Sequence, residues 1–376
     1  MTRKFLRIGL WVLFFGTACL AAPFHYARNF SLDSTEGFLR LRIFVDKDTA
    51  IYALCPEGRC PSHIDPRARP ISIPLRRVIC MTSVHEGYLE VLNLRERIVG
   101  VDQASFICDS TLRALGKHHA WSEVGSDAQT DWEKVVALRP DAILYSYPPG
   151  GVSSLNPKAK ALRIPALATP EWLENDPLGR AEWVRLYGIL FGRKRMADSL
   201  FAVVQRGYDS LKATVQLRKQ RPTAIVGLGW RGQWFVSGGG SYVAQLLRDA
   251  GIHYLWEDDK HTGALTLGLE GVLEKGRNAE LWINASDARS LAGLQGMEPR
   301  SIKFRAFREG RVYQNDAKLC AEGGNGYWET GAIRPDLLLS DFVHITDGTL
   351  DTRPGNYYRR LPETNSGKNS GAAGHP

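Results

Sequence analysis

The stretch RVICMTSVHEGYLEVLNLRERIVGVDQ, residues 77–103, decides the fold. It begins with β-branched and apolar residues, Arg77–Thr82, that are typical of a buried strand. A helix is expected next, with Ser83 as its candidate N-cap. The apolar segment Ile98–Val101 then predicts a second strand. A strand, a helix and a strand in this order favour a parallel sheet covered by helices.

The same alternation continues on both sides of a long helical segment. In the first half, a helix is expected at 132–138 and strands at 142–145 and 164–168. In the second half, strands are expected at 224–228, 234–236, 255–257, 280–284 and 311–314, and helices at 242–250, 270–275 and 335–344. We therefore expect an N-terminal α/β lobe at 75–178 and a C-terminal α/β lobe at 222–350.

The segment between the lobes, 179–221, predicts linking helices. A first helix covers 179–191 and stops near Gly192, and a second runs over 193–217. The apolar residues of the second step by three or four, which gives one stripe: Met196, Leu200, Val204, Tyr208, Leu211 and Val215. At ~1.5 Å per residue the helix is a rod of roughly 37 Å. Such a rod can hold two lobes at a fixed separation.

Both ends of the chain differ from these lobes. Arg3 and Lys4 precede a short apolar run and small residues, so 1–22 predicts a secretory signal peptide. Segment 30–74 predicts a small N-terminal β extension, because 37–53 alternates apolar and polar residues around a turn. The tail 363–376 is rich in Gly, Ser and Asn, which is typical of disorder.

Charge and cysteine content narrow the function classes. The net charge of +8 is modest for 376 residues and is not gathered into a nucleic-acid patch, so we expect no nucleic-acid partner. Export permits disulfides, and Cys55 and Cys60 bracket a turn-like PEGR segment as a candidate pair. Beyond Cys19 five cysteines remain, so at least one thiol is free or pairs with another chain. No metal site is expected, because the spacing near Cys55 is not that of a zinc site.

Three segments in succession resemble one known family. These are residues 77–103, then VGSDAQTDWEKVVALRPDAILYS at 124–146, then the long helix with the second lobe. Together they resemble the periplasmic binding proteins of ABC importers for ferric siderophores, haem and cobalamin, over about 75–345. The resemblance implies an α/β fold of two lobes joined by one long helix, with a ligand groove between the lobes. Segment 30–74 lies outside it.

The resemblance also implies a partner and a location. The protein would be a periplasmic monomer that delivers its ligand to an ABC transporter permease in the inner membrane. Cys19 resembles the lipidated cysteine of bacterial lipoproteins, and cleavage near Ala21 or Ala22 to give a soluble protein stays the alternative. In the family one acidic residue on each lobe docks on the permease, and Glu133 and Glu270 match those positions.

Aromatic residues beside glycines mark candidate ligand contacts in the second lobe. In GLGWRGQWFVSGGG, residues 227–240, Trp230 and Trp234 can stack on a flat ligand and Arg231 can bind an acidic group. In GGNGYWETG, residues 323–331, Tyr327 and Trp328 offer a further wall. For each segment the alternative is ordinary packing within the lobe.

The first lobe supplies three more candidates. Tyr145 and Tyr147 end a strand and share a face by alternation, so both are expected to reach the groove. His85 begins the first helix, at a junction that faces the cleft in the resembling family. A histidine at such a position is otherwise a surface or capping residue.

We therefore expect an exported, non-enzymatic receptor that captures an iron chelate, haem or a cobalamin-type ligand. It needs no cofactor of its own, and the ligand would carry iron or cobalt. The alternatives are a receptor for free zinc or manganese, a secreted hydrolase, and a module of the same fold that binds a protein. Against the hydrolase, the sequence holds no G-x-S-x-G, H-E-x-x-H or P-loop pattern.

Overall fold

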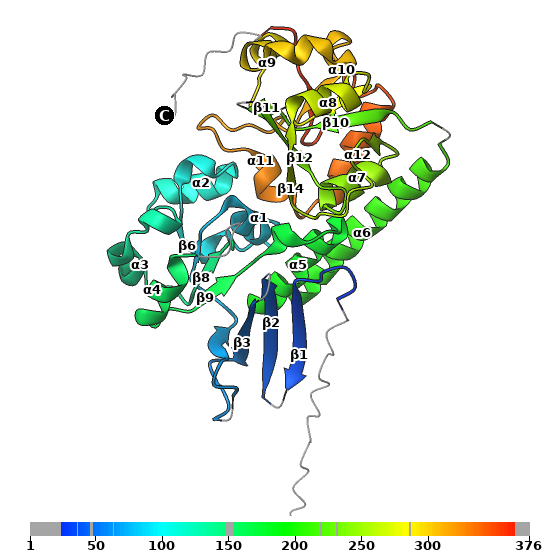
Figure 1. Ribbon diagram of the computed structural model, residues 1–376. Coiled ribbons are helices and arrows are strands. Elements are labelled where there is room, and N and C mark those ends of the chain that lie inside the picture. Colours follow the sequence, from blue (N-terminus) through cyan, green and yellow to red (C-terminus); the bar gives the residue numbers. More distant parts are fainter. Residues whose placement is uncertain are drawn as a thin grey trace, which may run out of the picture.

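The computed structural model describes residues 24–35, 37–45, 48–62, 64–147, 153–218, 220–230, 232–285 and 287–364. They form a small N-terminal sheet, two α/β lobes and a pair of helices that runs between the lobes (Figure 1). The predicted signal segment 1–22, with Cys19, lies outside the described residues, and so do Arg231 and the predicted tail beyond residue 364.

The N-terminal lobe is built on a five-stranded parallel sheet in the order β7-β6-β5-β8-β9. Its strands are short and apolar because helices cover both faces. They are β5 Val78–Cys80, β6 Ile98–Val101, β7 Ser122–Glu123, β8 Ala142–Tyr145 and β9 Ala166–Ala168. The helices are α1 Ser83–Val91, α2 Ser110–Lys117, α3 Trp132–Leu138 and α4 Leu155–Ala161. Thr82 is the N-cap of α1 and Ser83 its first residue, which corrects the predicted cap by one position.

The C-terminal lobe holds a second five-stranded sheet in the order β13-β10-β15-β16-β17, in which only the last pair is antiparallel. The strands are β10 Thr223–Val226, β13 His253–Tyr254, β15 Leu281–Ile283, β16 Val312–Gln314 and β17 Arg359–Arg360. Its helices are α7 Tyr242–Asp249, α8 Leu269–Gly276, α9 Leu291–Met297, α10 Arg305–Arg308, α11 Gly326–Thr330 and α12 Pro335–Thr346. The strand predicted at 255–257 is instead a turn after β13.

A separate antiparallel sheet extends this lobe. It joins β11 Gly229–Trp230, β12 Gln233–Ser237 and β14 Ala264–Gly268 in that order. The strand expected at 234–236 therefore belongs to this small sheet and not to the parallel one.

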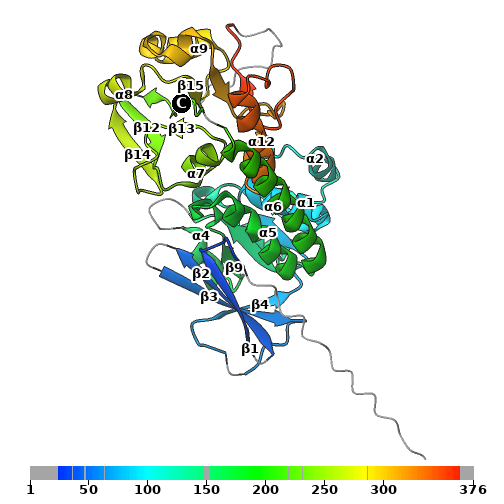
Figure 2. The same ribbon diagram turned by 90° about the vertical axis from the view of Figure 1, so that its right-hand side faces the viewer.

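Two helices connect the lobes, α5 Pro177–Leu190 and α6 Lys194–Gln216. Gly192, at φ +71°, makes the turn between them. The helices are close-packed: a Cβ on Gly188 would lie 2.4 Å from the Cβ of Ala197. One contiguous apolar core runs from the N-terminal sheet through the helices into the C-terminal lobe. The predicted rod is thus packed along its length, as Figure 2 shows for α5, α6 and α12.

The N-terminal sheet consists of β1 Phe30–Thr35, β2 Phe38–Val45, β3 Asp48–Pro56 and β4 Arg69–Ile73, paired in that order. It lies below the N-terminal lobe (Figure 1). Tyr52 fixes it there, because its hydroxyl donates to the carbonyl oxygen of Ala166 at 3.1 Å.

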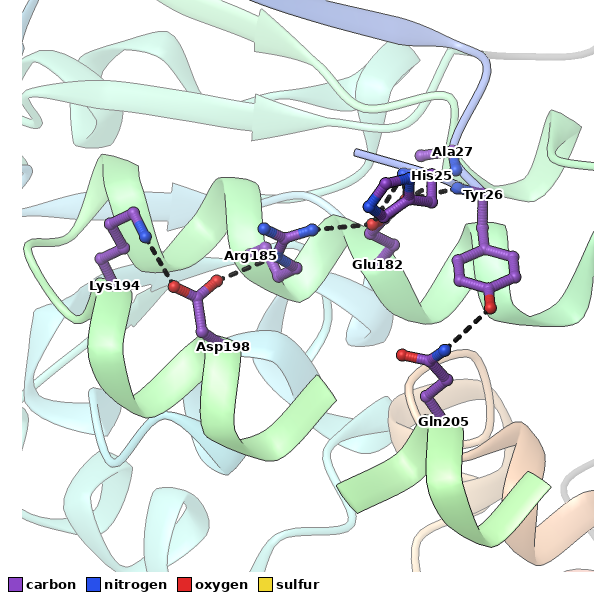
Figure 3. A network of polar contacts seen from close by, with 8 residues as sticks. All are labelled: His25, Tyr26, Ala27, Glu182, Arg185, Lys194, Asp198 and Gln205. Carbon is purple, nitrogen blue, oxygen red and sulfur yellow. Dashed lines mark hydrogen bonds and ion pairs between the residues drawn. The ribbon is translucent and has the colours of Figure 1, made fainter. Parts of the chain in front are cut away.

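A buried carboxylate fastens the chain before β1 to the linking helices (Figure 3). Glu182 of α5 is 0 % exposed and accepts hydrogen bonds from the backbone N–H groups of residues 25–27 at 2.8 to 3.1 Å. Arg185 pairs with Glu182 at 2.8 Å and with Asp198 of α6 at 2.9 Å. The Gln205 amide donates to the hydroxyl of Tyr26 at 2.9 Å. This network positions the N-terminal sheet relative to the helices between the lobes.

Two disulfides are present among the described residues. Cys55 and Cys60, the pair named from the sequence, have their Cα atoms 5.1 Å apart. Cys108 and Cys320 form the second pair, with Cα atoms 5.5 Å apart, and this pair was not predicted. Cys80 is buried and unpaired. In the part of the chain that is described, no helix is long and apolar enough to cross a membrane.

Candidate functional site

Each lobe has one point where neighbouring parallel strands send their connections in opposite directions. In the N-terminal lobe this point lies between β5 and β8, and in the C-terminal lobe between β10 and β15. Crevices at the carboxyl ends of such strands are the usual ligand sites of α/β sheets. The residues that follow these strands therefore define the candidate site.

A hollow of about 430 Å³ opens at the carboxyl edge of the C-terminal sheet. Its wall comes from the ends of β15 and β16, the start of α7 and the loop that leads into α11. Residues that line it include Tyr242, Asn284, Arg289, Gln314, Asp316, Tyr327 and Trp328. We call this hollow the ring-lined pocket.

Three aromatic rings form one side of the ring-lined pocket. The hydroxyls of Tyr242 and Tyr327 lie 3.3 Å apart, and the rings of Tyr327 and Trp328 meet edge to face at 4.7 Å. Tyr327 is buried, which raises its pKa well above the ordinary value, whereas Trp328 is 53 % exposed. The two residues predicted from GGNGYWETG thus lie in contact. Tyr327 is buried, and it packs against Trp328, whose ring is exposed.

Acceptor oxygens form the floor of the pocket. Gln314 ends β16 and Asp316 follows it, and they are 6 % and 8 % exposed. Arg359 pairs with Oδ2 of Asp316 at 2.6 Å. Within the described residues, Oδ1 of Asp316, Oε1 of Gln314 and Oδ1 of Asn284 are buried without a hydrogen-bond partner. A buried acceptor without a partner costs about 1 to 3 kcal/mol, so this floor is suited to donors on a bound molecule.

Aromatic groups also lie at the ends of β8 and β9 of the N-terminal lobe, and they do not line the ring-lined pocket. Trp172 lies in the turn after β9, and its indole N–H donates to the carbonyl oxygen of Tyr147 at 3.0 Å. Both side chains are partly exposed. Trp172 was not among the predicted residues, although an aromatic residue just after a predicted strand is the same signal that singled out Tyr147.

His85 does not reach a groove. It is 0 % exposed, and its Nε2 lies 2.7 Å from the hydroxyl oxygen of Thr169. Burial lowers its pKa to about 3, so the ring is neutral at physiological pH. The predicted ligand contact is therefore wrong in this structure, because the ring is buried and lies against Thr169 of its own lobe. Among the described residues, no group of three or more His, Cys, Asp or Glu is placed to hold a metal ion.

Two further predicted contacts are core residues. Trp234 is 0 % exposed, its ring lies 5.4 Å from that of Trp282, and its indole N–H donates to the carbonyl oxygen of Val226 at 2.9 Å. Tyr145 is 2 % exposed and packs among the apolar residues under α3 and α4. Both predictions are wrong, since a side chain enclosed by its own lobe cannot contact a ligand.

The remaining predicted residues are Trp230, Arg231, Glu133 and Glu270. Trp230 ends β11, but its side chain lies outside what the structure describes, as does the whole of Arg231. Glu133 and Glu270 are exposed in the first turns of α3 and α8, one on each lobe. Glu270 lies 3.4 Å from the guanidinium of Arg300.

Contacts across the lobe boundary are polar as well as apolar. The guanidinium of Arg180, in α5, lies 4.4 Å from the ring centre of Tyr242 in α7. The hydroxyl of Tyr88, in α1, donates to the carbonyl oxygen of Arg180 at 2.7 Å. Tyr242 thus connects the linking helices to the ring-lined pocket.

Comparison with solved structures supports this architecture. A periplasmic binding protein from Veillonella parvula superimposes with a TM-score of 0.61 over 83 % of this chain and 99 % of that one, at 13 % identity. A periplasmic heme binding protein from Pseudomonas aeruginosa gives a TM-score of 0.53 over 71 % of this chain and 92 % of that one, at 20 % identity. At these identities the likeness concerns the fold.

Sequence comparison gives the family. An uncharacterized lipoprotein of Methanocaldococcus jannaschii is 27 % identical over 292 residues, which are 73 % of this chain and 66 % of the relative, just under two thirds of its length. The family described as periplasmic binding protein matches residues 78–319, which cover the N-terminal parallel sheet, the linking helices and every strand of the C-terminal sheet except β17. The chain belongs to the periplasmic binding protein family.

Proposed function

We propose that the protein is an exported receptor that captures a ring-bearing solute, an iron chelate, haem or a cobalamin-type molecule, and delivers it to an ABC transporter permease. Family membership indicates an extracytoplasmic binding protein with a small-molecule ligand and a transporter partner. The observation that carries the finer proposal is the ring-lined pocket. It joins an open indole face, at Trp328, to a floor of acceptor oxygens.

The chemistry of the pocket suits a flat ligand with few negative charges. An aromatic stack on Trp328 contributes about 0.5 to 1.5 kcal/mol beyond the area it buries. Arg289 is exposed in the pocket wall and can bind one acidic group of the ligand. Asp316 and the amide oxygens repel further anionic groups and accept N–H donors. A cobalamin-type ligand, whose amide side chains donate N–H groups, therefore fits this pocket better than a heavily anionic chelate.

Delivery requires that the permease contacts both lobes. Glu133 and Glu270 are exposed at the starts of α3 and α8, where carboxylates also complement the helix dipoles. We propose that they pair with cationic residues of the permease, and that lipidation at Cys19 anchors the monomeric receptor to the membrane. Charge reversal at both glutamates is then expected to abolish transport while solute binding stays intact.

Fluorescence titration tests the site. Purified protein is titrated with cobalamin, haem and a panel of ferric siderophores while tryptophan emission is recorded. We expect saturable quenching by at least one ligand, with weaker quenching and lower affinity in Trp328→Ala. Trp132→Phe is the matched control, because this tryptophan lies at the start of α3, in the other lobe. Equal affinity in Trp328→Ala and the wild type would contradict the assignment of the ring-lined pocket.

A further inference from the structure

A covalent bond ties the two lobes together far from the linking helices. Cys108 belongs to the loop between β6 and α2 of the N-terminal lobe, and Cys320 to the loop before α11 of the C-terminal lobe. The two residues are 212 positions apart in sequence. We call the two segments around them, 105–113 and 318–330, the clasp.

Hydrogen bonds and an ion pair surround this disulfide. The carboxylate of Glu329 accepts hydrogen bonds from the backbone N–H groups of Cys108 and Asp109, both at 3.2 Å. Arg113 of α2 forms an ion pair with Glu322. Every one of these contacts joins one lobe to the other, so the clasp holds by several interactions at once.

The backbones within the clasp also approach closely. A Cβ on Gly324 would lie 2.5 Å from the carbonyl oxygen of Phe106. Next to the clasp, a Cβ on Gly87 of α1 would lie 1.8 Å from the carbonyl oxygen of Glu329. Only glycine permits these approaches, since any side chain would force the lobes apart.

The clasp and the linking helices lie on opposite sides of α1. In Figure 1, α2 and the loop before α11 meet to the left of α1, whereas α6 lies to the right. The lobes are therefore held at two separate edges, one by continuous chain and one by the clasp. A two-lobed receptor held at both edges can open only if one of these connections is released.

We propose that the Cys108–Cys320 disulfide is a redox-sensitive lock between the lobes, and that its reduction by a dithiol releases the clasp and speeds solute exchange. In this step one thiolate of the dithiol attacks a sulfur of the bridge and releases the other cysteine as a thiolate. The second thiolate of the dithiol then attacks the mixed disulfide and releases the remaining cysteine, and each cysteine takes up a proton from solvent. Two electrons pass to the bridge, Cys108 and Cys320 become thiols, and the dithiol becomes a disulfide.

The bridge is accessible to such a reductant. Both cysteines line a surface hollow of about 430 Å³. Charged groups of both signs line the same hollow: Arg113 and Lys318, and the carboxyl groups of Glu90, Asp109 and Glu329. Cys80, the unpaired cysteine of the described chain, is buried in β5, so it cannot exchange with the bridge without unfolding.

Hydrogen exchange measured by mass spectrometry tests the lock without any ligand. Wild-type protein is compared before and after treatment with a dithiol, and with the double variant Cys108→Ala/Cys320→Ala. Cys55→Ala/Cys60→Ala is the matched control, because its bridge spans five positions within the N-terminal extension. We expect amides of 105–113 and 318–330 to exchange about tenfold faster after reduction and in the first variant, but not in the control.

Two results would contradict the proposal that this disulfide locks the lobes together. One is a non-reduced digest that lacks the peptide linked through Cys108 and Cys320. The other is exchange in the clasp that stays the same after complete reduction of the wild type. Because reduction acts on protein that is already folded, poor folding of the alanine variant does not remove this test.

The effect on solute exchange rests on the proposed function and is measured separately. With a solute that binds, stopped-flow dissociation is expected to be several times faster from the reduced protein than from the oxidised one. If the dissociation rates were equal although reduction had loosened the clasp, the proposed effect on solute exchange would be contradicted, but not the proposed lock between the lobes. A failure of all solutes to bind would instead contradict the proposed function.

Discussion

Glu182 fixes the chain before β1 to the linking helices. Its carboxylate is fully buried, accepts three backbone N–H groups from residues 25–27 and pairs with Arg185 (Figure 3). Removal of one partner from a buried ion pair costs about 3 to 5 kcal/mol. We expect Glu182→Ala to lower the free energy of unfolding by about 3 kcal/mol, because Arg185 keeps Asp198.

Urea unfolding followed by circular dichroism measures this change. Glu133→Ala is the control, since that carboxylate is exposed and its loss is expected to change stability by less than about 0.5 kcal/mol. A Glu182 variant as stable as the control would show that the network does not fix the N-terminal extension.

Glu329 makes the lobe boundary sensitive to pH. Burial raises its pKa to about 7, and nearby Asp109 adds to this, while the N–H groups of Cys108 and Asp109 and the charge of Arg95 act against it. Glu86 and Glu90 also face it. The folded protein thus binds more protons than the unfolded chain between about pH 4.5 and 7. The protein is therefore more stable below about pH 4.5, where Glu329 is protonated, and loses this stability as the pH rises to about 7 and the carboxyl group ionises.

The variant Glu329→Gln isolates this contribution. It keeps an acceptor oxygen for the two backbone N–H groups but cannot ionise. Between pH 5 and pH 7.5, we expect the variant to lose about 2 kcal/mol less stability than the wild type in urea unfolding. If the stability of the two proteins depended on pH in the same way, Glu329 would not be the group responsible for the loss of stability.

Tyr327 and Trp328 lie between glycines in α11, and both line the ring-lined pocket. Their contact with a ligand stays a prediction. Tyr145 and Trp234 lie on strands, and alternation only separates two faces of a sheet. The sheet of β8 is covered on both faces. Trp234 lies on the covered face of β12, whose other face is exposed at Phe235, and the sequence could not show which face is covered.

At the scale of elements, local periodicity was sufficient to predict the long linking helix, whereas shorter helices such as α2, α4 and α9 were not predicted. The apolar stripe predicted a helix at 193–217, and α6 spans Lys194–Gln216. The strand β14, Ala264–Gly268, was missed because it lies on the surface and has no buried residue among its five. Its pairing with β12 comes from the tertiary fold, which a local pattern does not contain.

The contact between α1 and α11 gives an element-scale prediction. Gly87→Ala places a methyl group where the carbonyl oxygen of Glu329 now lies, at 1.8 Å. We expect the variant to separate α1 from α11 and to destabilise the protein by about 2 kcal/mol or more. Thermal unfolding measures the stability, and small-angle scattering measures the separation of the lobes.

Gly271→Ala is the matched control for this prediction. This glycine lies within α8 and a Cβ on it meets nothing within 4 Å. The substitution is expected to stabilise the helix by about 0.5 to 1 kcal/mol. If Gly87→Ala behaved like this control, the lobes would not be in the close contact described here.

At the scale of the whole molecule, the two-lobed fold could be predicted because strand and helix signals repeat in order along the chain. The clasp could not be predicted. Five cysteines outside the signal segment permit many pairings, and sequence does not select among them. The bond between Cys108 and Cys320 depends on how the lobes face each other, which is a property of the assembled fold.

At this scale, the proposed function is that the chain binds one solute molecule. Isothermal titration calorimetry of the purified protein with cobalamin, haem and ferric siderophores tests this most directly. The account predicts saturable binding of at least one of these solutes, one molecule per chain, with a negative heat-capacity change from buried apolar surface. If none of the three classes produced a saturable heat at protein concentrations well above micromolar, the receptor function would be contradicted.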